Sequence, residues 1–454
     1  MVDTDNKGNF IPKVAESWEI SEDGNTWTFK IRENIKFHNG DQLTAHDVLF
    51  TVERFIVPES TNPWSPYLGK NLDSMEVLDE YTFVYRTKTP EPPLLIAFNA
   101  LQILPKNYIE EVGIEEFRKK PVGSGPWKFV EYISKTSLKL EANTDYWGKV
   151  PAYQYVVDLL VPEEMTRINM LRTGDVDIAL NINTDRVVEL EGEDGIRSQV
   201  IGNPTTWNIS FPGTWITDKP TSDIRVRQAM SYAINRQEIV DTFYVGKGQP
   251  GGFWFMHPGG YGWDPAWKTD EYDPERAQQL LADAGYPDAF KDPTITYYTP
   301  AGPGVDQAAL LQGYWEEIGL KVDVEVVDQV QFQAMFLVRE EDPKAPNIGN
   351  IFPWSTAAPT NSMYHSANMY TSKGVHTTGH EPEIDELYNK ALTEIDPDLA
   401  LQYWREFRET VHAKYTNVGI VMLDTLVLVG PKLGEFTNNT HLTPYYTLNH
   451  IMHP

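Results

Sequence analysis

The first part of the chain is dominated by short stretches in which hydrophobic and polar side chains alternate. Residues 27–31 and 82–85 follow this pattern, which is typical of half-buried β-strands because successive side chains point to opposite faces of a sheet. Thr44 is a suitable helix N-cap and is followed three residues later by Asp47, and this pair predicts a helix over residues 48–55. We therefore expect strands, turns and one helix here.

Strand-like and helix-like patterns then alternate between residues 122 and 210. Residues 155–161 predict a strand, residues 163–173 predict a helix that Gly174 ends, and residues 176–180 predict another strand. A helix that stops at a glycine and is followed by a strand is typical of an α/β layer.

Helical spacing of apolar residues is more frequent further along the chain. Asp273 is suited to cap a helix that has Pro274 at its first position, which is where proline is tolerated. Apolar residues recur at helical spacing over residues 310–318, and an alternating strand follows over residues 321–327. The complete pattern predicts a mixed α/β protein with at least two lobes.

Composition narrows the class of protein further. The 454 residues, of which 41% are hydrophobic, are enough for two to three domains with large cores and exclude a disordered chain. The net charge of −27 disfavours nucleic acid and anionic membrane surfaces as partners. Cysteine is absent, which excludes disulfides, thiolate nucleophiles and cysteine metal sites. No run of residues approaches the roughly 18 apolar side chains of a membrane span.

Motifs for catalysis and for metal binding are weak. Residues 123–125 read Gly-Ser-Gly, but Val122 stands where a nucleophile elbow needs glycine, so a turn is the better interpretation. His376 and His380 are four residues apart, as two zinc ligands on one helix would be, but the residues around them favour a loop. We therefore predict no catalytic residue, no metal site and no cofactor.

Several tryptophans lie outside the predicted helices. Trp207 precedes Asn208, Trp254 lies in a glycine-rich segment, and Trp354 precedes Ser355. Core packing explains most aromatic residues in any protein, whereas a flat apolar ring beside a few polar groups is also what a site for sugar rings or peptide side chains requires. Both interpretations are open from these residues alone.

An ordered set of longer motifs makes the chain resemble a known family. The motifs are residues 14–32, 36–40 and 43–48; the Pro-Val-Gly-Ser-Gly-Pro-Trp turn at residues 121–127; Asn143, Tyr146 and Trp147; residues 172–177; residues 223–229 with 233–236; and residues 272–286. In this order they closely resemble the family 5 extracytoplasmic solute-binding proteins, the oligopeptide, dipeptide and nickel-binding group that serves ABC importers.

The resemblance implies an α/β fold of the type II periplasmic-binding-protein class, a two-lobed clamshell with the extra small domain of the oligopeptide-binding members. Residues 1–120 would form the small domain. Residues 121–208 with 425–454 would form the first lobe, and residues 209–424 the second. A small ligand, either an oligopeptide or an oligosaccharide, would be captured between the lobes and delivered to an ABC permease in the membrane.

Three departures from the family pattern matter. A signal segment, a lipid-anchor cysteine and the first core strand have no counterpart here, so we expect a periplasmic or extracellular protein, with or without a lipid anchor, whose front end is missing. Peptide-binding members place an Asp shortly after a Gly-Trp motif, whereas residues 351–361 contain no acid, which favours a neutral, hydroxyl-rich ligand. His365 lies in the region where nickel-binding relatives use a histidine, but we expect no metal capture.

The favoured interpretation is therefore a monomeric, non-enzymatic binding protein. Two alternatives remain at this point: a secreted hydrolase on a binding-protein scaffold, and the ligand-binding subunit of a sensory receptor. The residues expected to line the ligand cleft, with aromatic rings for stacking and with Asn and Ser for hydrogen bonds, are Trp207, Asn208, Trp254, Trp354, Ser355 and Tyr364.

Overall fold

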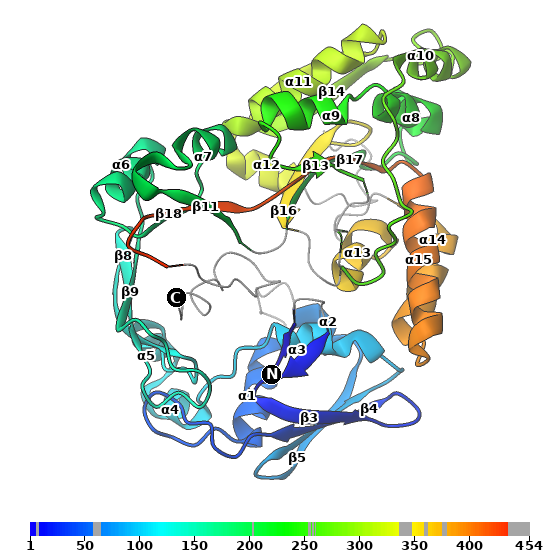
Figure 1. Ribbon diagram of the computed structural model, residues 1–454. Helices are drawn as coiled ribbons and strands as arrows, with labels where there is room; N and C mark the ends of the chain where they lie inside the picture. The colour runs from blue at the N-terminus through cyan, green and yellow to red at the C-terminus, as the bar shows by residue number, and fades with distance from the viewer. Residues whose placement is uncertain are drawn as a thin grey trace. The chain divides into compact units, whose positions relative to one another are not determined.

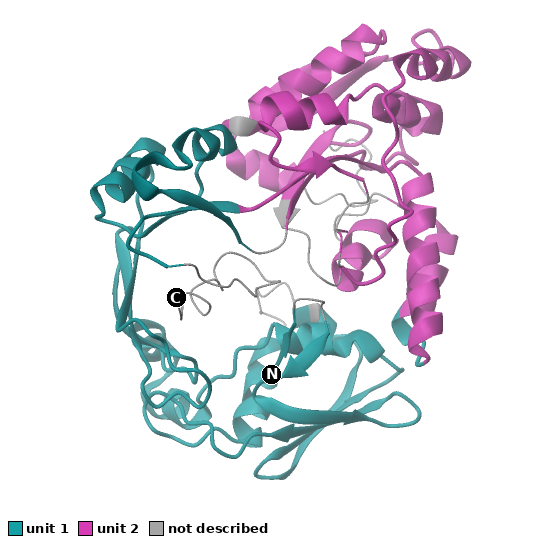
Figure 2. Ribbon diagram, in the orientation of Figure 1, with its two compact units in different colours: residues 1–202, 392–395, 426–454 teal, residues 203–391, 396–425 magenta. Residues whose placement is uncertain are grey.

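The computed structural model describes residues 1–5, 9–57, 65–201, 204–252, 256, 258, 260–335, 347–357, 362–374 and 379–434. The chain divides into two compact units (Figure 2). Unit 1 contains residues 1–202, 392–395 and 426–454, and unit 2 contains residues 203–391 and 396–425. The division into a small domain of residues 1–120, a first lobe of residues 121–208 with 425–454 and a second lobe of residues 209–424 stays a prediction.

Unit 1 begins with a four-stranded antiparallel sheet in the order β3-β4-β6-β5. Its strands are β3 (Ala15–Ile20), β4 (Thr26–Ile31), β5 (Leu72–Asp79) and β6 (Thr82–Thr87). Strands β4 and β6 confirm the two strands predicted in this region. Helix α1 (Ala45–Phe55) starts with the predicted capping box of Thr44 and Asp47. The core holds buried rings from β4, β6 and α3, namely Trp27, Phe29, Phe83, Tyr85 and Phe98.

The rest of unit 1 consists of two three-stranded sheets, β7-β8-β9 and β10-β18-β11, with helices and a small hairpin (Figure 1). Helix α6 ends at Gly174, which has the left-handed backbone typical of a glycine C-cap, as predicted. The elements are β1 (Val2–Thr4), β2 (Phe10–Pro12), α2 (Ser65–Gly69), η1 (Pro92–Leu94), α3 (Leu95–Asn99), α4 (Lys106–Val112), α5 (Ile114–Lys119), β7 (Trp127–Ile133), β8 (Ser137–Ala142), β9 (Tyr155–Leu159), α6 (Glu164–Thr173), β10 (Ile178–Ala179), α7 (Thr184–Leu190), η2 (Glu193–Gly195), β11 (Arg197–Val200) and β18 (Leu426–Val429).

Unit 2 is built on a four-stranded antiparallel sheet in the order β13-β17-β12-β16 and on a parallel pair, β14-β15. Helices α8, α10 and α11 contribute to its main hydrophobic core, together with residues of β12, β14, β15 and β17. The elements are β12 (Thr205–Ser210), η3 (Pro220–Ser222), α8 (Ile224–Tyr232), α9 (Arg236–Glu238), the π-helix η4 (Ile239–Phe243), β13 (Gln249–Pro250), α10 (Pro274–Asp283), β14 (Thr294–Pro300), α11 (Pro303–Glu317), β15 (Lys321–Val327), α12 (Gln329–Met335), β16 (Phe352–Ala357), α13 (Met363–Tyr370), α14 (Pro382–Thr393, its last two residues in unit 1), α15 (Pro397–Ala413) and β17 (Asn417–Leu423).

A buried arginine, Arg227, gives the motif at residues 223–229 a structural role in this fold. Arg227 of α8 donates to the carbonyl oxygens of Thr221 (2.6 Å), Ser222 (3.1 Å) and Lys414 (2.8 Å). Burial lowers the pKa of its guanidinium to about 10, so the group stays charged at neutral pH. A buried charge is tolerated only when its donors are satisfied, and Arg227 meets this need by linking α8 to the turn after α15.

His38 joins two other motifs within unit 1. The Gly123 N–H donates to Nδ1 of His38 (3.2 Å), so Nε2 carries the proton and donates to the carbonyl oxygen of Gly125 (2.9 Å). The side-chain amide of Asn143 donates to the same carbonyl (3.1 Å). Burial lowers the pKa of His38 below its ordinary value of 6.5, the hydrogen bond to the Gly125 carbonyl acts in the opposite direction, and Lys128 lowers the pKa further.

Replacing His38 by phenylalanine is expected to reduce the pH dependence of stability. A histidine whose pKa is lowered by folding binds its proton more readily in the unfolded chain, so its contribution is complete above pH 6.5 and is lost as the pH falls below that value. Thermal unfolding at pH 7.5, 6.5 and 5.5 should show a steeper loss in the wild-type protein than in His38→Phe. His46, which is exposed on α1, supplies the control His46→Phe. Equal slopes in all three proteins would contradict this role of His38.

No helix in the described part of the chain combines the length and the apolar character that crossing a membrane requires.

Candidate ligand-binding site

Four of the six predicted site residues lie on two neighbouring strands of unit 2. In the antiparallel pair β12 and β16, Trp207 lies opposite Ser355, and Asn208 lies opposite Trp354. All four belong to unit 2. Because side chains alternate along a strand, the two pairs project from opposite faces of the sheet.

Trp207 projects into the hydrophobic core of unit 2. Its side chain is 1% exposed, and its ring makes an edge contact with Tyr244, with 6.4 Å between the ring centroids. Burial raises the pKa of the Tyr297 hydroxyl, and the Trp207 indole is the polar neighbour that acts against this shift. The ring is thus covered by side chains of its own unit, and a ligand contact by Trp207 stays a prediction.

The opposite face of β12 is polar. Thr206, Asn208 and Ser210 are all buried, and the Asn208 side-chain amide donates to Oγ1 of Thr206 (3.1 Å). The Ser210 hydroxyl donates to the carbonyl oxygen of Phe352 on β16 (3.1 Å). Trp354 is half-buried on the same face as Asn208, so this face combines neutral hydrogen-bonding groups with an aromatic ring.

The remaining predicted residues are distributed differently. Ser355 is exposed on β16, Tyr364 of α13 is only 1% exposed, and Trp254 lies outside the described residues. His365 follows Tyr364, and burial lowers its pKa to about 4, so the imidazole is neutral at physiological pH, as a metal ligand would be. Within the described ranges, however, no three His, Cys, Asp or Glu side chains are close enough together to hold a metal ion. His376 of the candidate histidine pair lies outside the described residues.

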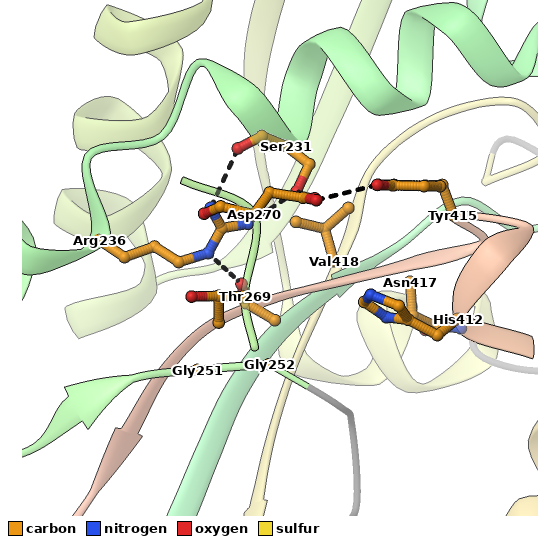
Figure 3. A pocket seen from close by; sticks show the side chains of 11 residues that line it. Ser231, Arg236, Gly251, Gly252, Thr269, Asp270, His412, Tyr415, Asn417 and Val418 are labelled. Atoms are coloured by element: carbon orange, nitrogen blue, oxygen red, sulfur yellow. Dashed lines mark hydrogen bonds between the residues drawn. The ribbon is translucent and has the colours of Figure 1, made fainter. Parts of the chain in front are cut away.

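A small pocket lies beside strand β17 (Figure 3). Gly419 is opposite Asn208, at a β-bulge where Ile420 is the extra residue. A Cβ atom added to Gly419 would lie 2.2 Å from the carbonyl oxygen of Gly252, so only glycine permits this close approach of two backbones. The lining residues are Ser231, Arg236, Gly251, Gly252, Thr269, Asp270, His412, Tyr415, Asn417, Val418 and Gly419.

Charged groups in this pocket are held by a hydrogen-bond network. Arg236 is 5% exposed and donates to the carbonyl oxygens of Gly419 (2.7 Å) and Ser231 (3.0 Å). The Asp270 carboxylate accepts from the hydroxyls of Ser231 (2.6 Å) and Tyr415 (2.9 Å). Burial lowers the pKa of His412, Asp270 acts in the opposite direction, and Arg408 and Arg236 lower the pKa further. The pocket thus brings one carboxylate, one imidazole and one buried guanidinium together.

Sequence reasoning did not select the residues of this network. Arg236 ends the Ala-Ile-Asn-Arg motif, which we used only as a family landmark, and Asp270 lies 34 positions further along the chain. The sequence offered one signal for this network, namely an arginine at the end of a largely apolar segment. Such a residue needs hydrogen-bond acceptors for its donors when it is buried. The identity of those partners depends on which segments the fold brings together.

The fold defines the class of protein. The structure of DppA from Helicobacter pylori in complex with the peptide STSA has a TM-score of 0.80 with 23% sequence identity, covering 99% of this chain and 90% of that chain. NikZ from Campylobacter jejuni, solved in complex with Ni(L-His), has a TM-score of 0.82 with 19% identity, covering 99% and 92%. The predicted type II periplasmic-binding-protein fold is therefore confirmed.

The sequence defines the family within this class. A family model described as bacterial extracellular solute-binding proteins, family 5 middle, matches residues 9–374, and the chain belongs to this family. Di/tripeptide-binding protein 1 of Pseudomonas aeruginosa (strain UCBPP-PA14) is 29% identical over 353 residues, which are 69% of this chain and 63% of the relative. The chain thus matches less than two thirds of the length of that relative.

Proposed function

We propose that this protein binds a small solute outside the cytoplasm and delivers it to the permease of an ABC importer. Membership of the family 5 solute-binding proteins carries the proposal, since this family consists of binding proteins. The local observation that supports it is the polar face of unit 2 on which the half-buried Trp354 lies opposite Asn208, whose side chain is as buried as that of Trp207. Strands β12, β16 and β17 contain no acidic or basic residue, so the ligand would be held there by neutral hydrogen bonds and aromatic contact.

A short peptide is the first ligand class in this proposal. The relative from Pseudomonas aeruginosa is a di/tripeptide-binding protein, and the Helicobacter pylori structure contains the peptide STSA. An oligosaccharide is the second class, because a half-buried tryptophan and neutral polar side chains also suit hydroxyl-rich rings. The absence of an acid between residues 351 and 361 favours contacts to the peptide backbone over a charge pair with its amino group. The protein would act as a monomer in the periplasm or at the cell surface, with or without a lipid anchor.

Isothermal titration of the full chain with panels of di- to pentapeptides and of oligosaccharides tests this proposal. We expect saturable binding to at least one panel. In Trp354→Ala the affinity for the tightest-binding compound should fall by about 30-fold, the equivalent of about 2 kcal/mol for a central aromatic contact.

A matched control is available in unit 1. Trp18 is a half-buried tryptophan on β3, so Trp18→Ala removes a ring of the same kind and should bind as the wild-type protein does. Absence of saturable binding to both panels would contradict the proposed function. Equal losses in the two variants would contradict the place of Trp354 in the site.

A further inference from the structure

The two ends of a long segment of unit 2 come together at the pocket. The segment leaves the sheet at Gly252, after β13, and returns at Thr269 and Asp270. A Cβ atom added to Gly252 would lie 3.3 Å from Cγ2 of Thr269, so the two ends are in contact. We call the contact of Gly252 with Thr269, together with the adjacent Asp270, the neck of this segment.

Asp270 connects the neck to two separate parts of unit 2. Its Oδ2 accepts from the hydroxyl of Ser231 on α8 (2.6 Å), and its Oδ1 accepts from the hydroxyl of Tyr415 in the turn before β17 (2.9 Å). These residues are 39 and 145 positions away along the chain. Hydrogen bonds donated to an ionised carboxylate are about twice as strong as those between neutral groups. The Asp270 side chain therefore holds the returning end of the segment in place.

Arg236 extends the same network to the candidate ligand-binding face. It donates to the Ser231 hydroxyl (2.8 Å), to the Asp270 carbonyl oxygen (3.3 Å) and to the Gly419 carbonyl oxygen (2.7 Å). Gly419 lies directly opposite Asn208 and meets the backbone of Gly252. Asp270 is therefore linked through Ser231 and Arg236 to the strand that flanks Asn208, without touching Asn208 itself.

The returning segment has a second attachment on α15. The Trp404 indole N–H donates to the carbonyl oxygen of Tyr261 (3.2 Å), and the Trp267 indole N–H donates to a carboxylate oxygen of Glu409 (3.0 Å). With the neck at its end and these bonds at Tyr261 and Trp267, residues 260–270 have a defined position along α15. Arg405 of α15 also donates to the carbonyl oxygens of Gly262 (3.4 Å) and Trp263 (3.4 Å).

We infer that Asp270 is a positioning residue for ligand binding, which fixes the neck of this segment and, through Arg236 and Gly419, the part of β17 beside Asn208. The inference rests on the proposed function, because it assigns Asp270 to the same ligand-binding face. A preformed site avoids the entropy cost of ordering its strands and loops when the ligand binds. Removing the Asp270 carboxylate should therefore weaken ligand binding, although this group does not itself touch the ligand.

Hydrogen exchange and titration of the same variants test this inference. In Asp270→Asn we expect backbone amides of residues 260–270 and 417–420 to exchange about tenfold faster, with other amides unchanged. The affinity for the probe trialanine should fall about tenfold. Asp323 is exposed on β15, and the control Asp323→Asn should match the wild-type protein in both measurements. Tyr415→Phe removes one of the two hydrogen bonds and should give a smaller change of the same kind, which serves if Asp270→Asn does not fold.

Three results would overturn the inference. The first is that Asp270→Asn and Tyr415→Phe exchange their amides at the same rate as Asp323→Asn. The second is that exchange increases uniformly across unit 2. The third is that exchange becomes faster locally while the affinity for trialanine is unchanged. The exchange measurement needs no ligand. If the wild-type protein bound neither trialanine nor any member of the two panels, the proposed function would fail, while the exchange result would still decide whether Asp270 holds the neck.

Discussion

Replacing Arg236 by methionine is expected to lower the free energy of unfolding of unit 2 by about 4 kcal/mol. The guanidinium is 5% exposed and donates to the carbonyl oxygens of Gly419 and Ser231 and to the Ser231 hydroxyl. Methionine fills a similar volume but has no donor, so these acceptors would remain buried without their arginine partner, and Asp270 would lose its nearby cation. Burial lowers the pKa of Arg236 to about 10, so the charge is present at pH 7 and the loss should be seen there.

Calorimetric unfolding of the wild-type and variant proteins measures this effect. For a unit of this size a loss of about 4 kcal/mol corresponds to a decrease in Tm of roughly 10 °C in the transition of unit 2. Arg186 is a suitable control because it forms an exposed ion pair with Glu189, so Arg186→Met should leave the transition almost unchanged. A similar small loss in Arg236→Met would show that the buried guanidinium is replaceable.

Replacing Gly419 by alanine is expected to cost about 3 kcal/mol and to weaken ligand binding. The added Cβ atom would lie 2.2 Å from the carbonyl oxygen of Gly252. The position of a Cβ atom is fixed by its own backbone, and its partner is a backbone carbonyl, so the clash cannot be relieved by a side-chain rotation and requires one backbone segment to move. Because Gly419 lies opposite Asn208, that movement should also change the candidate ligand-binding face.

The chain offers a matched glycine for comparison. A Cβ atom added to Gly313 of α11 would have no heavy atom within 4 Å, so Gly313→Ala should stabilise the protein by about 1 kcal/mol through higher helix propensity. Urea unfolding measures both variants, and titration with the peptide panel measures binding. Equal stability of Gly419→Ala and the wild-type protein would contradict the close approach of Gly419 and Gly252.

Local patterns predicted many of the elements well. The strands β4, β6 and β15, the capped start of α10 at Asp273 and the glycine end of α6 all appear where the spacing of residues placed them. These features depend on interactions within a few residues of one another. They are visible in the sequence because capping, glycine stops and alternation act over that short range.

The candidate site was less accessible to such reasoning. Trp207 and Asn208 are neighbours in the sequence and were both expected to line the ligand cleft, yet they project from opposite faces of β12, and the Trp207 ring is buried in the core. A pattern of polar and aromatic residues cannot show which face of a buried strand is covered by helices. The pairing of β12 with β16 brings Asn208 and Trp354 together across 146 positions of the chain, and that pairing is a property of the sheet.

The spacing of apolar and polar residues along the chain, together with the ordered motifs, was enough to determine a mixed α/β protein and its family. Both depend on residues that are close in the sequence. The tertiary structure alone decided that Arg236, Asp270, Ser231, Tyr415 and Gly419 form one network beside the candidate face. A buried charge must find its partners wherever the packing of distant segments supplies carbonyls and hydroxyls, and local spacing does not specify those segments.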